Sequence, residues 1–125
     1  MKSISTDTAP TPAGHYSQAM VHGGLAYVAG QLPIDPARPG VLDDTTEGQT
    51  RQALANVAAV LEAAGSGLDQ VLQMTVYVTD ISLWPAVNAA YADVMGDHRP
   101  ARAVVPVKTL KEGMVIEIQA IAVVP

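Results

Sequence analysis

Apolar residues repeat with two different periods along the chain, and one of these periods is helical. After Thr46, which with Gln49 fits a capping box, apolar side chains recur every three or four residues until Gly65 supplies a stop signal. The same spacing returns between Ser82, which can cap a helix, and Gly96. The pattern therefore predicts two amphipathic helices.

The other period is two residues, which is typical of a strand covered on one face. It is clearest over residues 72–79, where apolar and more polar side chains alternate. Gly23 and Gly24 separate two short apolar segments and fit a hairpin turn in which both residues adopt positive φ. Two further strands are predicted at 101–107 and 114–124.

Together these elements predict an α+β fold in the order ββαβαββ. Because the alternation leaves only one face of the sheet apolar, both helices should pack on that face. Residues 1–14 are rich in Thr, Ser and Pro and predict an extended arm rather than a packed element, and the prolines of 33–44 predict a loop. The chain shows no internal repeat, so residues 1–125 are expected to form a single domain.

The composition changes the picture by pointing to an oligomer. Apolar residues make up 49% of the chain and charged residues only 15%, against about 25% in an average soluble domain. A surface this poor in charge favours burial of part of it between subunits. A monomer whose surface is rich in Ser, Thr and Gln is the alternative that the composition leaves open.

The charge balance and the lack of cysteine exclude several partners and sites. A net charge of −5, with seven scattered Lys and Arg residues, would repel a phosphate backbone, so no nucleic acid partner is expected. Without cysteine there is no disulfide and no thiol nucleophile. Apolar runs such as residues 57–61 cannot span a membrane, and the N-terminus carries no signal-peptide stretch. We expect a soluble cytoplasmic protein that does not bind membranes.

A carboxylate within an apolar strand needs a physical reason. Glu117 lies between β-branched neighbours and shares a strand face with Gln119 and Ile121. Burial of an unpaired charge is expensive, so Glu117 should face solvent, pair with a cation or belong to a polar site with a shifted pKa. An exposed residue on an ordinary strand is the simpler interpretation, and the sequence leaves both open.

Arg102 is a lone cation at the head of the strand predicted at 101–107. If the last two strands pair as a hairpin, Arg102 can reach Glu117. One interpretation is a structural ion pair between them. The other is a carboxylate clamp, to which the planar guanidinium is suited, beside a general base. A clamp and a base are the minimum equipment for chemistry at the α-carbon of an amino-acid-like substrate.

Other kinds of active site find little support in the residues. His15, His22 and His98 have no metal-ligand spacing, so no metal site is predicted. The serines do not lie in a nucleophile elbow, and the chain has no glycine-rich loop for phosphates or dinucleotides. The sequence therefore points to a site for a small molecule that works without a metal or an organic cofactor.

Short motifs spread over residues 13–123 carry a family resemblance. They lie at 14–19, 29–33, 49–50, 56–57, 63–65, 75–80, 87–91, 100–102 and 116–122. Each motif alone is weak, but in this order and spacing they resemble the RidA/YjgF family of reactive-intermediate deaminases. The resemblance implies a chorismate-mutase-like fold assembled as a homotrimer with three clefts between subunits, in agreement with the charge-poor surface.

The resemblance also implies an activity and a set of site residues. The activity is the hydrolysis of 2-aminoacrylate-type or other 2-imino acids to 2-keto acids and ammonia. By this resemblance Arg102 grips the substrate carboxylate, and Glu117 orients and activates water at the imine carbon. Tyr16 and the Gly30 amide shape the pocket. Asn88 is a further substrate-binding position, although a helical Asn could instead brace a subunit contact.

Two positions depart from the family's usual pattern and keep other functions open. Ala29 stands where many active members have a serine, and Val104 stands where a cysteine is common. A second hypothesis is therefore a binding module in which Arg102 holds a keto acid or another small carboxylate without turnover. A third, the ribonuclease activity attached to some family names, fits poorly with the acidic charge and the absence of a histidine pair.

Overall fold

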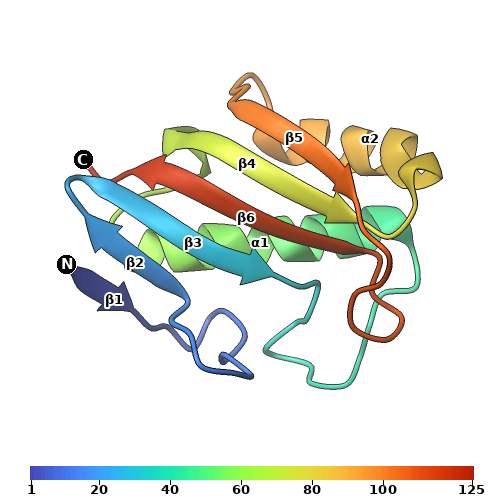
Figure 1. Cartoon of the computed structure of the whole chain (residues 1–125), viewed down its shortest axis with the longest axis horizontal. Coiled ribbons are helices and arrows are strands. Elements are labelled where there is room, and N and C mark those ends of the chain that lie inside the picture. The colour runs from blue at the N-terminus through green and yellow to red at the C-terminus, as the bar shows by residue number, and fades with distance from the viewer.

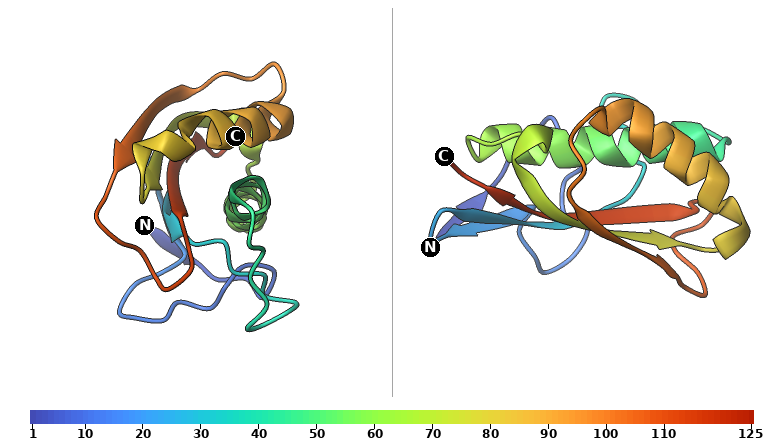
Figure 2. Two further views of the ribbon diagram at one scale, coloured as in Figure 1. Left: turned by 90° about the vertical axis from the view of Figure 1, so that its right-hand side faces the viewer. Right: turned by 90° about the horizontal axis from the view of Figure 1, so that it is seen from above.

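A computed structural model describes residues 1–125. It shows a six-stranded mixed sheet with two helices on one face (Figures 1 and 2). The strands are β1 (Lys2–Ile4), β2 (Ala19–His22), β3 (Leu25–Gln31), β4 (Val71–Val78), β5 (Ala101–Pro106) and β6 (Ile116–Val123). The helices are α1 (Thr46–Ala63) and α2 (Trp84–Met95), with 3₁₀ turns at Leu68–Gln70 and Ile81–Leu83.

The strands follow the order β1-β2-β3-β6-β4-β5 across the sheet. The pair β4 and β5 is parallel, and the other pairs are antiparallel. The last strand, β6, is therefore central, and β5 forms an edge. The predicted α+β class is confirmed, as is the packing of both helices on one face (Figure 2).

Part of the predicted N-terminal arm packs against the sheet. Its first residues pair with β2 as the extra strand β1, and Ile4 and Ala9 are buried in the core. The buried Gln18 holds the segment in between, because its Oε1 accepts from the Thr6 N–H at 2.7 Å and its Nε2 donates to the Thr6 and Pro10 carbonyls, each at 3.0 Å. Because Nε2 also donates to the Ala9 carbonyl at 3.4 Å, one polar side chain satisfies four backbone groups of the arm.

The start of α1 differs by one residue from the predicted capping box. Thr45, rather than Thr46, caps the helix, and its hydroxyl accepts from the Gly48 N–H at 3.0 Å. Gln49 does not close the box. Its Oε1 instead accepts from the Val115 N–H at 2.8 Å, which ties α1 to the segment before β6.

The start of α2 also differs from the prediction, which placed the cap at Ser82. Leu83 is at the N-cap of α2 and supplies no side-chain cap. Asp80 instead caps the preceding 3₁₀ turn, because its Oδ1 accepts from the Ser82 N–H at 2.8 Å. Pro85 lies in the first turn of α2, where its missing N–H costs nothing. Gly96, at φ 61°, ends the helix as predicted.

The core lies between the helices and one face of the sheet. Leu54, Val57 and Leu61 of α1 are fully buried, as are Ile116 and Ile118 of β6. The alternate residues of β6 point away from the helices. This second face of the sheet, which we call the open face, has no helix over it (Figure 2). Neither helix has the length and apolar character to cross a membrane.

Candidate functional site

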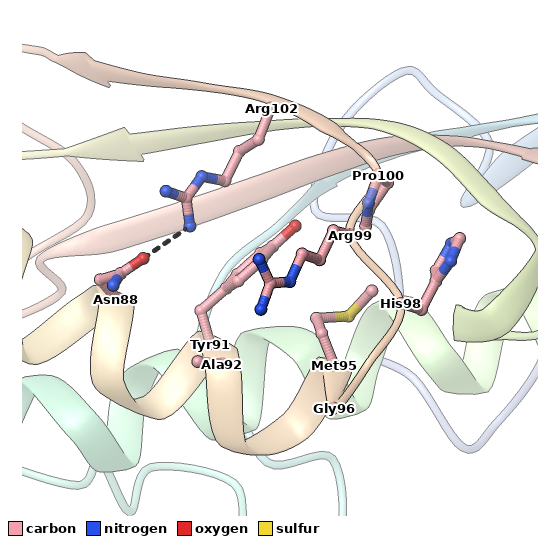
Figure 3. Close-up of a pocket in the computed structure, with 9 residues that line it drawn as sticks. All are labelled: Asn88, Tyr91, Ala92, Met95, Gly96, His98, Arg99, Pro100 and Arg102. Atoms are coloured by element: carbon pink, nitrogen blue, oxygen red, sulfur yellow. Dashed lines mark hydrogen bonds between the residues drawn. The ribbon is translucent and has the colours of Figure 1, made fainter.

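Arg102 lies on the helix side of the edge strand β5. Its register partner on β4 is Met74, a core residue, and paired residues of neighbouring strands point to the same face. Nη1 of Arg102 donates to Oδ1 of Asn88 at 3.1 Å (Figure 3). The guanidinium carbon lies 4.7 Å from the ring centres of both Trp84 and Tyr91. These three contacts fix the guanidinium while most of its donors remain available.

The partners of Arg102 all come from one face of α2. Trp84, Asn88 and Tyr91 are spaced by four and three residues, so they line up along the helix. Each cation–π contact contributes about 0.5–1 kcal/mol at a partly exposed site. Of these three residues, the sequence motifs predicted a site role only for Asn88, and Trp84 was missed. The signal that could have found Trp84 is its spacing of four residues from Asn88.

Arg102 and Asn88 line a cleft of about 500 Å³ between α2 and the start of β5. Tyr91 is 6% exposed, and its hydroxyl has no hydrogen-bond partner in the chain. Burial raises the pKa of this hydroxyl, and the nearby Arg102 charge opposes the rise. His98 holds the far wall in place, because its Nε2 donates to the Val71 carbonyl at 2.8 Å. The cleft is thus a preformed space with a fixed cation at one end.

Glu117 lies on the open face, where β3 carries a bulge. Val28 pairs with Ala120 and Gln31 with Ile118, so Ala29 and Gly30 together stand opposite one residue of β6. The bulge brings Gly30 against the Glu117 side chain. A Cβ at Gly30 would lie 2.9 Å from Cδ of Glu117 and closer still to its Oε2. Because glycine has no Cβ, the backbone at residue 30 and the Glu117 carboxylate can lie this close together.

Tyr16 also lies on the open face, about half exposed, in a shallow concavity of about 410 Å³. Tyr27, Ala29 and Gln119 share this concavity with it. The bulge residue Ala29 thus links the concavity to Gly30 and Glu117. The structure brings Tyr16, Gly30 and Glu117 to one face of the sheet.

The five predicted site residues therefore form two groups within one chain. Arg102 and Asn88 lie on the helix side, whereas Tyr16, Gly30 and Glu117 lie on the open face. The expected hairpin between the last two strands is wrong, because β6 is inserted between β3 and β4 and does not touch β5 in the sheet.

The alternative of a structural ion pair is wrong as well. The ion pairs of the chain are Arg38 with Asp35 and Arg51 with Asp93, and neither includes Arg102 or Glu117. Arg102 therefore has no carboxylate partner and Glu117 has no cationic partner within the chain. The chain also brings together no group of three or more His, Asp or Glu side chains.

Comparisons with known proteins identify the family. The model of the family described as Endoribonuclease L-PSP matches residues 6–124. The 2-iminobutanoate/2-iminopropanoate deaminase of Salmonella typhimurium is 39% identical over 125 residues, which cover 98% of this chain and 97% of that protein. This chain therefore belongs to the RidA/YjgF family, as the motifs predicted.

Solved structures agree with this assignment. RidA from an Antarctic Psychrobacter species matches with a TM-score of 0.92 and 36% identity, over 98% of this chain and 99% of that one. Escherichia coli TdcF with bound serine matches with a TM-score of 0.93 and 33% identity, over 98% of each chain. The fold is thus the RidA-type, chorismate-mutase-like fold.

Proposed function

We propose that this protein hydrolyses 2-imino acids to 2-keto acids and ammonia, in a site that two subunits of a homotrimer share. Family membership supports the reaction class, because the Salmonella relative at 39% identity is a 2-iminobutanoate/2-iminopropanoate deaminase. The observation that carries the proposal is the pair of unpartnered groups. Arg102 has free donors beside a cleft without a carboxylate, and Glu117 is a half-buried carboxylate without a cation.

Arg102 is the clamp for the substrate carboxylate. Its planar fork can donate two parallel hydrogen bonds to one carboxylate, and the contacts with Asn88, Trp84 and Tyr91 hold the fork before the substrate arrives. A fixed clamp lowers the entropy lost when the imine carbon is placed for attack. The TdcF structure with bound serine supports an amino-acid-like ligand for such a site.

Glu117 is the general base. Its carboxylate takes a proton from a water molecule as the water oxygen bonds to the imine carbon. Glu117 returns this proton to the nitrogen, which gives a tetrahedral intermediate with one hydroxyl and one amino group. The carboxylate then takes the hydroxyl proton and passes it to the amino group as the carbon–nitrogen bond breaks, so the keto acid forms and ammonia leaves. The imine is already electrophilic, so positioning and one base are sufficient and no cofactor takes part. Tyr16 and the Gly30 amide form the wall of the pocket next to the base.

A shared site follows from the separation of the two groups. The helix side of one subunit, with Arg102, would meet the open face of the next, with Glu117, in a head-to-tail contact that closes after three subunits. Exposed aromatic residues support this contact on both surfaces: Trp84 lies beside Arg102, and Tyr16 and Tyr27 lie on the open face. The low content of charged residues agrees with it.

Two experiments test the proposal. Light scattering should give three times the 13.0 kDa mass of one chain at micromolar concentration, and a monomer would overturn the shared site. Imino acids made in situ by an amino-acid oxidase can be trapped with semicarbazide. The protein should lower the trapped yield while keto acid forms faster, and an unchanged yield would overturn the deaminase activity.

The same assay separates the two other functions. A module that only binds keto acids or similar carboxylates would bind without raising the rate, and Ala29, which offers no hydroxyl at the bulge, is the residue that favours this outcome. Ribonuclease activity would appear as cleavage of RNA. The net charge of −5 opposes RNA binding, so we expect no cleavage.

A further inference from the structure

The cleft next to Arg102 contains a second arginine that the proposed reaction does not use. Arg99 lies three residues before Arg102, in the segment that joins α2 to β5, and both line the same cleft (Figure 3). Three residues of extended chain span at most about 11 Å. Because Arg102 is held in place, the longer reach of the free Arg99 side chain decides whether both arginines can contact opposite ends of one small molecule, and this spacing allows it.

The cleft carries positive charge in an acidic protein. Its nine lining residues include Arg99, Arg102 and His98 but no Asp or Glu. Arg99 takes part in neither ion pair of the chain and in no side-chain hydrogen bond. Two like charges that face one cleft repel each other unless an anion lies between them. With a net charge of −5 for the whole chain, this local excess of cations needs an explanation.

The wall between the two arginines is fixed. In Figure 3 the Tyr91 side chain is drawn between those of Arg102 and Arg99. The Tyr91 ring lines the cleft, while its hydroxyl is buried and lacks a partner in the chain. The His98 hydrogen bond to the Val71 carbonyl anchors the segment that carries Arg99.

We infer that Arg99 binds a second anionic group of the substrate, so that the protein prefers 2-imino dicarboxylic acids, the imines of acidic amino acids. This inference rests on the proposed function, in which Arg102 binds the carboxylate next to the imine carbon. The side chain of the substrate then runs along the cleft past Tyr91, and its terminal carboxylate accepts hydrogen bonds from Arg99. A neutral side chain would leave the Arg99 charge without a partner.

A matched pair of substrates tests the inference by turnover. Glutamate and norvaline yield imines of the same chain length, and only the glutamate imine has a second carboxylate. The wild-type protein should hydrolyse the glutamate imine with the higher kcat/KM. Because a lost charge-assisted contact lowers affinity about tenfold to a hundredfold, Arg99→Gln should lower kcat/KM by that factor for the glutamate imine and less than twofold for the norvaline imine.

The control is Arg38→Gln, which removes the same charge from an exposed loop outside the cleft, where Arg38 pairs with Asp35. It should change neither rate by more than about twofold, because Arg38 does not line the cleft and its exposed charge is screened by solvent and salt. If Arg99→Gln lowers both rates equally, or neither, the inference is overturned and the deaminase proposal stands.

Binding distinguishes failure of the inference from failure of the proposed function. Calorimetry with 2-oxoglutarate and 2-oxopentanoate, which differ only in the terminal carboxylate, needs no turnover. The wild-type protein should bind 2-oxoglutarate at least tenfold more tightly, and Arg99→Gln should abolish the difference. This result would support the second anion site even if no imine were hydrolysed. Equal affinities in the wild-type protein would overturn it.

Discussion

Replacing Gly30 with alanine should disable the proposed base without unfolding the protein. The new Cβ would lie 2.9 Å from Cδ of Glu117, whereas ordinary contacts begin near 3.4 Å. The carboxylate must therefore move, and its nearer oxygen must move further than Cδ. A displacement of roughly 1 Å in a reacting group can lower the rate about 10²-fold.

The fold should tolerate the change, because Gly30 does not have a positive φ and the obstructed atoms belong to the end of a flexible side chain. We expect a change in the free energy of unfolding within about 1 kcal/mol. The matched control is Gly67→Ala. A Cβ there would lie 2.9 Å from Oδ1 of Asp69, so it displaces another carboxylate, away from the proposed site.

The assay measures kcat/KM for imine hydrolysis and the thermal midpoint of all three proteins. Gly30→Ala should lose about two orders of magnitude in kcat/KM with a nearly unchanged midpoint, and Gly67→Ala should keep wild-type activity. A fully active Gly30→Ala protein would refute the placement of Glu117 as the base. Equal losses in both variants would show that the effect is not specific to the site.

Three other changes have defined outcomes. Glu117→Gln should lower turnover about 10²-fold or more while keto-acid binding survives, and unchanged turnover would assign Glu117 a structural role. Arg102→Lys keeps the charge but loses the fork, so activity should fall steeply while the thermal midpoint hardly moves; an active lysine variant would refute the clamp. The Ser82 N–H lowers the pKa of Asp80, so the stabilisation from this carboxylate is present at neutral pH and is lost as the pH falls through its folded-state pKa. Melting curves should show a smaller loss below about pH 4 for Asp80→Asn than for the wild type, and equal losses would contradict this.

Local patterns predicted the elements of this fold well. Gly23 and Gly24 have φ of 59° and 76°, as a two-glycine hairpin requires, and Gly65 and Gly96 follow their helices with positive φ. These features depend on neighbouring residues alone, so the sequence is sufficient to find them. The capping side chains lie one or two residues before the predicted positions, because several hydroxyl and carboxylate groups near each helix start can accept the same N–H groups.

The arrangement of the site could not be predicted, because it depends on pairings between distant segments. Nothing in the last two strands reveals that β6 enters between β3 and β4, yet this insertion separates Glu117 from Arg102. The strand β1 is only three residues long, too short for a period of two to be visible, and Ile4 alone is buried. The stacking of Trp84 on Arg102 likewise depends on where α2 crosses the edge of the sheet.

Complementation between two inactive variants tests the shared site most directly. Arg102→Ala removes the clamp and Glu117→Gln removes the base, so each variant alone should be inactive. In any mixed trimer of head-to-tail contacts, one of the three sites combines an intact Arg102 with an intact Glu117. Equal co-expression should therefore restore about one quarter of the wild-type activity per chain. If the mixture stays as inactive as the separate variants, the two residues do not act together across a subunit contact.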